Sequence, residues 1–222
     1  MQLTETLEAL EAAGSEQTRK TYARHGVPEP MYGVSYAVLE QLRKRIKRNA
    51  ALAEDLWATG NADARVLACK VADPAAIPPG WAAQVDHKTL SAAFAELTAA
   101  APDAIALAEA WIDAPDAHLA CLGWQVIAGL AAKTTKPPDE QLAALLPRIE
   151  ATIHQAPNQV RNAMNVALIA IGVRSDALAE TAIAHARRIG KVEVDHGDTA
   201  CKTPDAEAYI IKTRERARKR SK

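Results

Sequence analysis

The segment from Lys191 to Asp205 combines chemically reactive side chains with the absence of a helical pattern. Its polar and reactive residues include Asp195, His196, Asp198, Cys201 and Lys202. Carboxylate, imidazole and thiolate groups are the usual ligands of zinc, so a metal site is one interpretation. Their spacing matches no zinc signature, and we therefore predict that the protein holds no metal and needs no cofactor.

Two other interpretations of this segment remain open, both of which treat residues 191–204 as a non-helical polar loop. In the first, Lys202 and the threonine hydroxyls donate hydrogen bonds to phosphates, and His196 lies near a cleft. In the second, the loop is structural, and its Asp and Thr side chains satisfy the hydrogen bonds of its own backbone.

Positive charge is concentrated in two other segments, although 27 Lys and Arg residues balance 27 Asp and Glu residues over the chain. The first is a block that contains Arg43, Lys44, Arg45, Lys47 and Arg48. The second is a basic C-terminal tail over residues 212–222. A polyanion responds to the local field rather than to the net charge, so each block indicates either nucleic-acid contact or a solvated helix face.

The elements that must position these residues are helices. Hydrophobic residues make up 49% of the chain and aromatic residues only 4%, so Ala and Leu carry most of the apolar content and favour close-packed helices. Cap and stop signals predict successive helices separated by Pro, Asp and Gly turns, including one continuous helix over 139–155. We predict an all-α fold, a HEAT-like or armadillo-type α–α superhelix of stacked antiparallel helix pairs, in a single domain over residues 1–222.

Several classes of protein are excluded by composition. No run of about 18 uncharged apolar residues occurs, so we expect no membrane span. The N-terminal residues are amphipathic and acidic, unlike a secretory signal. Cys69, Cys121 and Cys201 are an odd number at wide spacing, which argues against a disulfide framework. We expect a cytoplasmic monomer.

A family resemblance begins at residues 31–34, Met-Tyr-Gly-Val, which precede a helix with the pattern Leu-x-x-Leu-Arg-Lys over residues 39–44. Three later stretches agree with it in order: NADARVLACKVAD at 61–73, WAAQVDHKTL at 81–90 and QVRNAMNVALIAI at 159–171. Over about residues 22–189 the chain resembles the AlkD-like DNA alkylation repair proteins, which are HEAT-like repeat alkylpurine DNA glycosylases.

The resemblance implies roles for particular residues. Asp86 matches the catalytic carboxylate, which stabilises an oxocarbenium-like transition state and orients a water molecule. Trp81 and Trp124 would pack against the deoxyribose of a cationic alkylated purine. Arg161 and the first basic block would bind the phosphates of double-stranded DNA. A competing interpretation of Asp86 is that it only caps the helix that follows.

The chain also departs from the family pattern. Trp81 lies five residues before Asp86, where the family has a spacing of four. The stretch 118–131 offers no Arg at the position from which the family's Arg reaches the cleft, and Val166 replaces an aromatic residue. These departures favour a second hypothesis, a non-catalytic HEAT-like scaffold that binds DNA or a protein.

Overall fold

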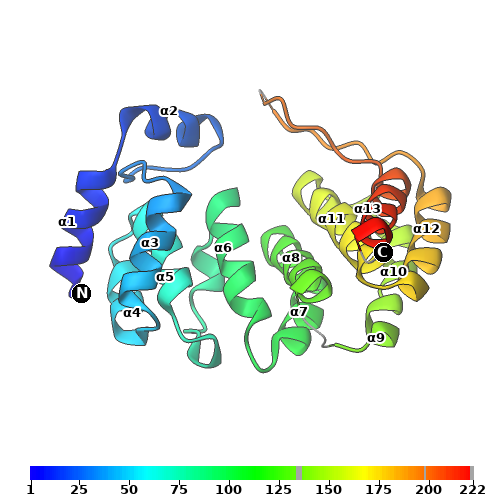
Figure 1. Cartoon of the computed structure of the whole chain (residues 1–222), viewed down its shortest axis with the longest axis horizontal. Helices are drawn as coiled ribbons and strands as arrows, with labels where there is room; N and C mark the ends of the chain where they lie inside the picture. Colours follow the sequence, from blue (N-terminus) through cyan, green and yellow to red (C-terminus); the bar gives the residue numbers. More distant parts are fainter. Residues whose placement is uncertain (134–136, 198, 221–222) are drawn as a thin grey trace. The chain divides into compact units, whose positions relative to one another are not determined.

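The computed structural model describes residues 1–133, 137–197 and 199–220 (Figure 1). Every regular element in these ranges is a helix, as predicted. The chain divides into two compact units, residues 1–102 and 103–222. The single domain over residues 1–222 stays a prediction.

Unit 1 contains six α-helices and two short 3₁₀ segments within the described part of the chain. Their bounds are α1 Leu3–Ala13, α2 Glu16–Arg24, α3 Tyr36–Ile46, α4 Ala50–Ala58, α5 Ala62–Val71, η1 Pro74–Ala76, η2 Ala82–Gln84 and α6 Lys88–Ala99. Helix α5 is central, because it packs against α3, α4 and α6. Leu56, Leu67 and Phe94 are fully buried in this core.

The pair α4 and α5 illustrates why the chain reverses where it does. Gly60 adopts a φ of 72° in the turn, a value that glycine accepts without a steric penalty. The Asn61 side chain then accepts hydrogen bonds from the backbone N–H groups of Asp63 and Ala64, at 3.0 and 3.2 Å. These bonds satisfy donors that the first turn of α5 would otherwise leave free.

Unit 2 contains the remaining helices of the described residues. Their bounds are α7 Ala104–Ile112, α8 Ala117–Lys133, α9 Asp139–Ala143, α10 Leu146–Thr152, α11 Asn158–Arg174, α12 Asp176–Ile189 and α13 Ala206–Arg220. Helix α11 packs against α8, α12 and α13. A Cβ atom on Gly172 of α11 would lie 2.6 Å from Ile210 and 2.9 Å from Ala182, so the close approach of these helices requires glycine there.

The predicted continuous helix over 139–155 is wrong. The structure has α9 and α10 in its place, separated by Ala144 and Leu145. Pro147 lies in the first turn of α10. Proline has no backbone N–H, so it is tolerated in a first turn but would break a continuous helix at this point.

No helix among the described residues is long and apolar enough to cross a membrane, in agreement with the hydropathy of the sequence.

Candidate nucleic-acid interface

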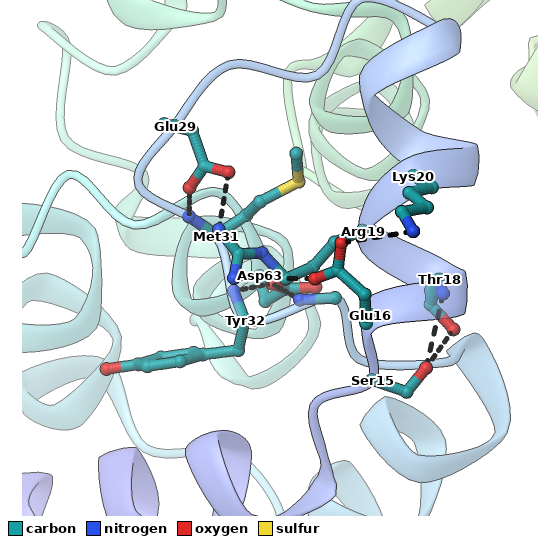
Figure 2. Close-up of polar contacts among 10 residues, drawn as sticks. Ser15, Glu16, Thr18, Arg19, Lys20, Glu29, Met31, Tyr32 and Asp63 are labelled. Carbon is teal, nitrogen blue, oxygen red and sulfur yellow. Dashed lines mark hydrogen bonds and ion pairs between the residues drawn. The ribbon is translucent and has the colours of Figure 1, made fainter.

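The Met31–Val34 turn that carries the family resemblance is held by a single buried carboxylate (Figure 2). One oxygen of Asp63 accepts hydrogen bonds from the N–H groups of Tyr32 and Gly33, at 2.7 and 2.9 Å. The other accepts the N–H of Val34 at 3.0 Å. Asp63 is only 3% exposed, so these three bonds replace the water that the carboxylate lost on burial. The contact ties the start of α3 to the first turn of α5.

Residues from α2 close over the other side of the same turn. Arg19 donates to Glu29 at 2.9 Å, and Glu29 also accepts the backbone N–H of Met31 at 2.9 Å. The Arg19 guanidinium and the Met31 N–H hold the pKa of Glu29 below its ordinary value. Gly33 has a φ of 77°, and a Cβ there would lie 2.7 Å from both the Arg19 nitrogen and the Ser15 oxygen. The turn that sets the direction of α3 is therefore held by Asp63 on one side and by α2 on the other.

The C-terminal half of α3 lines a basic hollow of about 740 Å³ together with α5 and α6. We call it the basic hollow and define it by its cations, which are Arg43, Lys44, Lys47, Arg48 and Lys70. Four of these were predicted as DNA-binding residues, whereas Lys70 was not. Sequence reasoning missed Lys70 because it is an isolated basic residue in a different helix. The predicted Arg45 is not part of the lining, and its guanidinium lies 3.8 Å from Glu5 of α1.

The charges of the basic hollow are only partly compensated. Arg43 donates three hydrogen bonds to Glu40, at 2.7 to 3.0 Å, and these bonds lower the pKa of Glu40. Arg48 lies 3.6 Å from Asp73. Among the described residues, no carboxylate oxygen lies within 4.0 Å of the ammonium nitrogens of the three lysines, Lys44, Lys47 and Lys70. An excess of positive charge therefore remains in the hollow, although Glu96 of α6 also lines it.

Lys47 at the rim of this hollow has an unusual backbone conformation. It ends α3 with φ 62° and ψ −148°, and its N–H bonds to the Arg43 carbonyl at 2.8 Å. Helix α12 ends in nearly the same way, with φ 69° and ψ −149°, but there the residue is Gly190. Only glycine adopts this region readily, so a lysine at this position is strained.

Asp86, the predicted catalytic residue, lies directly before α6 with its side chain 52% exposed. It does not cap this helix. The N-cap is His87, whose Nδ1 accepts the N–H of Leu90 at 3.3 Å. An accepting Nδ1 places the ring proton on Nε2, which is buried and 3.9 Å from an Asp86 oxygen. Burial lowers the pKa of His87, so the ring is neutral near pH 7.

The two tryptophans predicted to contact the lesion are buried. Trp81 is 5% exposed and stacks on Trp57, with ring centroids 4.1 Å apart and planes at 4°. Trp124 is 1% exposed, and the Arg148 guanidinium lies 6.0 Å from its ring centroid. A ring that is enclosed by its own core presents no face to a deoxyribose, so the predicted contact does not fit either position.

The polar loop over residues 191–204 has no helix in its described residues and projects away from α11, α12 and α13 (Figure 1). Asn158 at the start of α11 anchors it by donating to the Asp195 carbonyl at 2.7 Å and accepting the Asp195 N–H at 2.8 Å. Arg161 donates to the Glu193 carbonyl at 2.9 Å and to two carbonyls that follow α10. These three bonds hold the terminal nitrogens of Arg161 against backbone carbonyls, whereas its Nε has no hydrogen-bond partner among the described residues. The role of Arg161 in phosphate binding stays a prediction.

Side chains near the tip of the loop satisfy its own backbone, as one interpretation anticipated. Asp195 accepts the Gly197 N–H at 2.8 Å, and Thr199 donates to the His196 carbonyl at 2.9 Å. His196 also shares a hydrogen bond of 3.0 Å with the Thr203 hydroxyl. Lys202 is exposed. Asp198 lies outside the described residues, and no group of three His, Cys, Asp or Glu side chains within them could hold a metal ion.

The basic C-terminal tail is helical as far as Arg220, because α13 extends to that residue. Arg214 and Arg218 both bond to Asp176 at the start of α12, at 2.6 and 3.0 Å. Arg214 also donates to the Val173 carbonyl at 3.0 Å. Part of the charge of the tail is therefore used to attach α13 to α12.

Comparisons with known proteins agree on the family. The sequence model of the DNA alkylation repair enzymes matches residues 6–209. An uncharacterised protein of Listeria innocua is 31% identical over 97% of each chain, and one of Listeria monocytogenes is 30% identical over 98% of each chain. A solved structure with 30% identity has a TM-score of 0.90 over 98% of this chain and 96% of its own. It represents a new family of proteins related to the HEAT-like repeat DNA glycosylases, with affinity for branched DNA structures.

The predicted resemblance and the predicted all-α, HEAT-like fold are both confirmed by these matches, which cover nearly the whole chain. We conclude that this chain belongs to the DNA alkylation repair enzyme family and has a HEAT-like repeat fold.

Proposed function

We propose that the protein binds DNA through the sugar–phosphate backbone and that it prefers branched DNA. The observation that supports this most strongly is the basic hollow, where Lys44, Lys47 and Lys70 bring unpaired charge together from two helices. The solved relative, which has affinity for branched DNA, supports the choice of ligand. The contacts are electrostatic, so recognition follows the path of the phosphates rather than the base sequence.

The hollow is built from residues of unit 1 alone, so one copy of the chain forms a complete site. We accordingly propose that a monomer binds branched DNA through phosphates at the branch point and in the adjoining double-stranded arms. The cytoplasmic location stays a prediction.

A charge-removal experiment tests this function. The double variant Lys44→Gln, Lys70→Gln should bind a labelled four-way junction more weakly than the wild type. It should also reduce the slope of log affinity against log salt by about 1.8, because each lost phosphate contact contributes about 0.9. Fluorescence anisotropy over a salt series measures both quantities.

The matched control is Lys20→Gln, which removes one charge from α2 outside the hollow. It should leave both affinity and slope nearly unchanged. If the double variant binds the junction as tightly as the wild type at every salt concentration, the hollow is not the binding surface.

A second candidate function is N-glycosylase activity on cationic alkylated purines. The observation that favours it is the availability of Asp86, whose carboxylate is half-exposed and free of helix capping because His87 performs that role. A carboxylate beside the sugar stabilises the positive charge that develops as the glycosidic bond breaks. The buried Trp81 and Trp124 add nothing to this site, so Asp86 would carry the chemistry without an aromatic partner among them.

Release of 3-methyladenine or 7-methylguanine from alkylated duplex separates the two candidates. Base release by the wild type that is lost in Asp86→Asn supports catalysis, because the substitution removes the charge and keeps the shape. Equal release by both proteins would place the chemistry elsewhere. Absence of release at enzyme excess, with junction binding intact, leaves DNA binding as the function.

A further inference from the structure

Tyr36 is a large side chain that is left half-exposed at the first position of α3. Its ring meets that of Tyr22 edge-on, with centroids 6.5 Å apart and planes at 66°. The Tyr22 hydroxyl in turn donates to the Val34 carbonyl at 2.9 Å, and burial raises the pKa of Tyr22 to about 12. The Tyr36 ring is therefore supported on one side by a fixed, uncharged neighbour while half of its surface faces solvent.

Tyr36 also lies on the same face of α3 as the basic hollow. Glu40, Arg43 and Lys44 follow Tyr36 by 4, 7 and 8 residues, which places these four positions along one stripe of the helix. Lys47 is the C-cap of α3 and continues this line, because it lines the same hollow. At 1.5 Å per residue, the stripe extends about 16 Å from Tyr36 to Lys47. We call these five positions the α3 stripe.

Along the α3 stripe, a compensated carboxylate comes first after Tyr36 and uncompensated lysines follow. Glu40 lies one turn beyond Tyr36, where a free carboxylate would repel a phosphate. Arg43 holds this carboxylate through three hydrogen bonds and compensates its charge. The next two members, Lys44 and Lys47, line the hollow together with Lys70 of α5. The stripe thus presents an aromatic ring at one end and uncompensated cations at the other.

We propose that the α3 stripe binds an unpaired DNA strand at a branch point, with one base stacked on the Tyr36 ring and the following phosphates at Lys44, Lys47 and Lys70. An exposed aromatic ring next to a cationic track is the combination by which single-stranded nucleic acid is bound without sequence preference. A base within intact duplex is stacked on both faces, so only an unpaired base can lie on the ring. This inference rests on the proposed binding of branched DNA and assigns the unpaired part of that ligand to unit 1.

The test measures the binding of three DNA probes to the wild type and to two variants of Tyr36. The probes are a 12-nucleotide oligo(dT), a blunt duplex and a fork with one unpaired arm. Tyr36→Ala should weaken binding of oligo(dT) and of the fork by about 5- to 140-fold, the effect of losing one base–aromatic stack. Tyr36→Phe keeps the ring and should bind all three probes as the wild type does. The affinity for blunt duplex should be the same in all three proteins.

A spectroscopic readout separates stacking from a general structural effect. A fork that carries 2-aminopurine as its first unpaired base should lose fluorescence when the wild type or Tyr36→Phe binds, because stacking on an aromatic ring quenches this base. Tyr36→Ala should bind at higher protein concentration without that quenching. Unfolding midpoints of the three proteins establish that each is folded.

Two outcomes have different meanings. If the wild type binds none of the DNA probes, the proposed function itself fails. If the wild type binds the fork, but Tyr36→Ala binds and quenches it equally well, the stacking role of Tyr36 is overturned while the proposed function stands.

Discussion

Asp63 and Lys47 of unit 1 are both in environments that are unusual for a charged residue. Asp63 is buried, yet three backbone N–H groups satisfy it and hold the turn before α3 (Figure 2). Lys47 is exposed, yet its backbone is strained. Strain that persists in a folded protein is often found at functional sites, and Lys47 lies at the rim of the basic hollow.

Lys47→Gly should raise stability and weaken DNA binding at once. Relief of the positive φ is favourable by about 1–3 kcal/mol, and the greater freedom of glycine in the unfolded chain opposes it by about 0.5–1 kcal/mol. We expect a net gain of about 1 kcal/mol in the free energy of unfolding, measured by urea denaturation. The salt slope for junction binding should fall by about 0.9.

Gly190→Ala is the matched control, because this residue ends α12 in the same conformation and an added Cβ would meet no atom within 4 Å. It should lower the free energy of unfolding by about 1 kcal/mol through backbone strain alone. A loss of stability in Lys47→Gly would show that the lysine side chain stabilises the fold and that the strain argument is wrong.

Residue identity alone did not reveal which candidate side chains are buried or already hydrogen-bonded within the protein. Arg161 has the right chemistry for a phosphate, but both of its terminal nitrogens already donate to backbone carbonyls from two segments. Trp81 and Trp124 have the right chemistry for a sugar, but both are buried. These outcomes depend on contacts with residues far away in the sequence, which spacing along the chain does not report.

At the scale of single elements, local signals predicted most helices but not every cap. Ser15, Ser35 and Asn61 are residue types that favour the N-cap, and each caps its helix with a side chain that accepts backbone N–H bonds. Helix α6 differs, since His87 occupies the position that was considered for Asp86. Histidine is an uncommon cap, so the carboxylate beside it was the stronger local signal.

The cap of α6 makes stability depend on pH. Burial lowers the pKa of His87 from its ordinary value of 6.5, and Arg65 lowers it further, while Asp86 and Asp63 oppose the shift. The unfolded chain therefore takes up a proton first as the pH falls. The contribution of His87 to the free energy of unfolding is complete above about pH 6.5. It is lost as the pH falls from there toward the lowered pKa that His87 has in the folded protein.

Urea midpoints between pH 7.5 and 5.0 measure this effect. His87→Asn keeps a side chain that can accept the Leu90 N–H and does not titrate in this range. The wild type should lose more stability than His87→Asn over the interval. Parallel pH profiles for the two proteins would exclude His87 as the source of the pH dependence.

For the molecule as a whole, the reactivity of the cysteine thiols indicates whether each compact unit is folded. Cys69 is buried in unit 1 and Cys121 in unit 2, whereas Cys201 is exposed on the polar loop. Burial raises the thiol pKa of Cys69 and raises that of Cys121 to about 11, so neither is reactive while its unit is folded.

A thiol titration should therefore find one reactive cysteine in the native protein and three in denaturant. In a Cys201→Ser variant, the native count should fall to zero. The denaturant concentration at which Cys69 and Cys121 each become reactive then measures the opening of its own unit. A native reaction that continues in Cys201→Ser would contradict the burial of the other two thiols.

The sequence by itself determined most of the helices and many of their caps and turns, as well as the family, because these depend on residues close together in the chain. Only the tertiary structure joined Lys70 to the block on α3, bound Asp63 to the turn thirty residues before it, and buried the candidate tryptophans. The physical reason is that burial and charge density are sums over neighbours in space. Most of those neighbours are contributed by other helices.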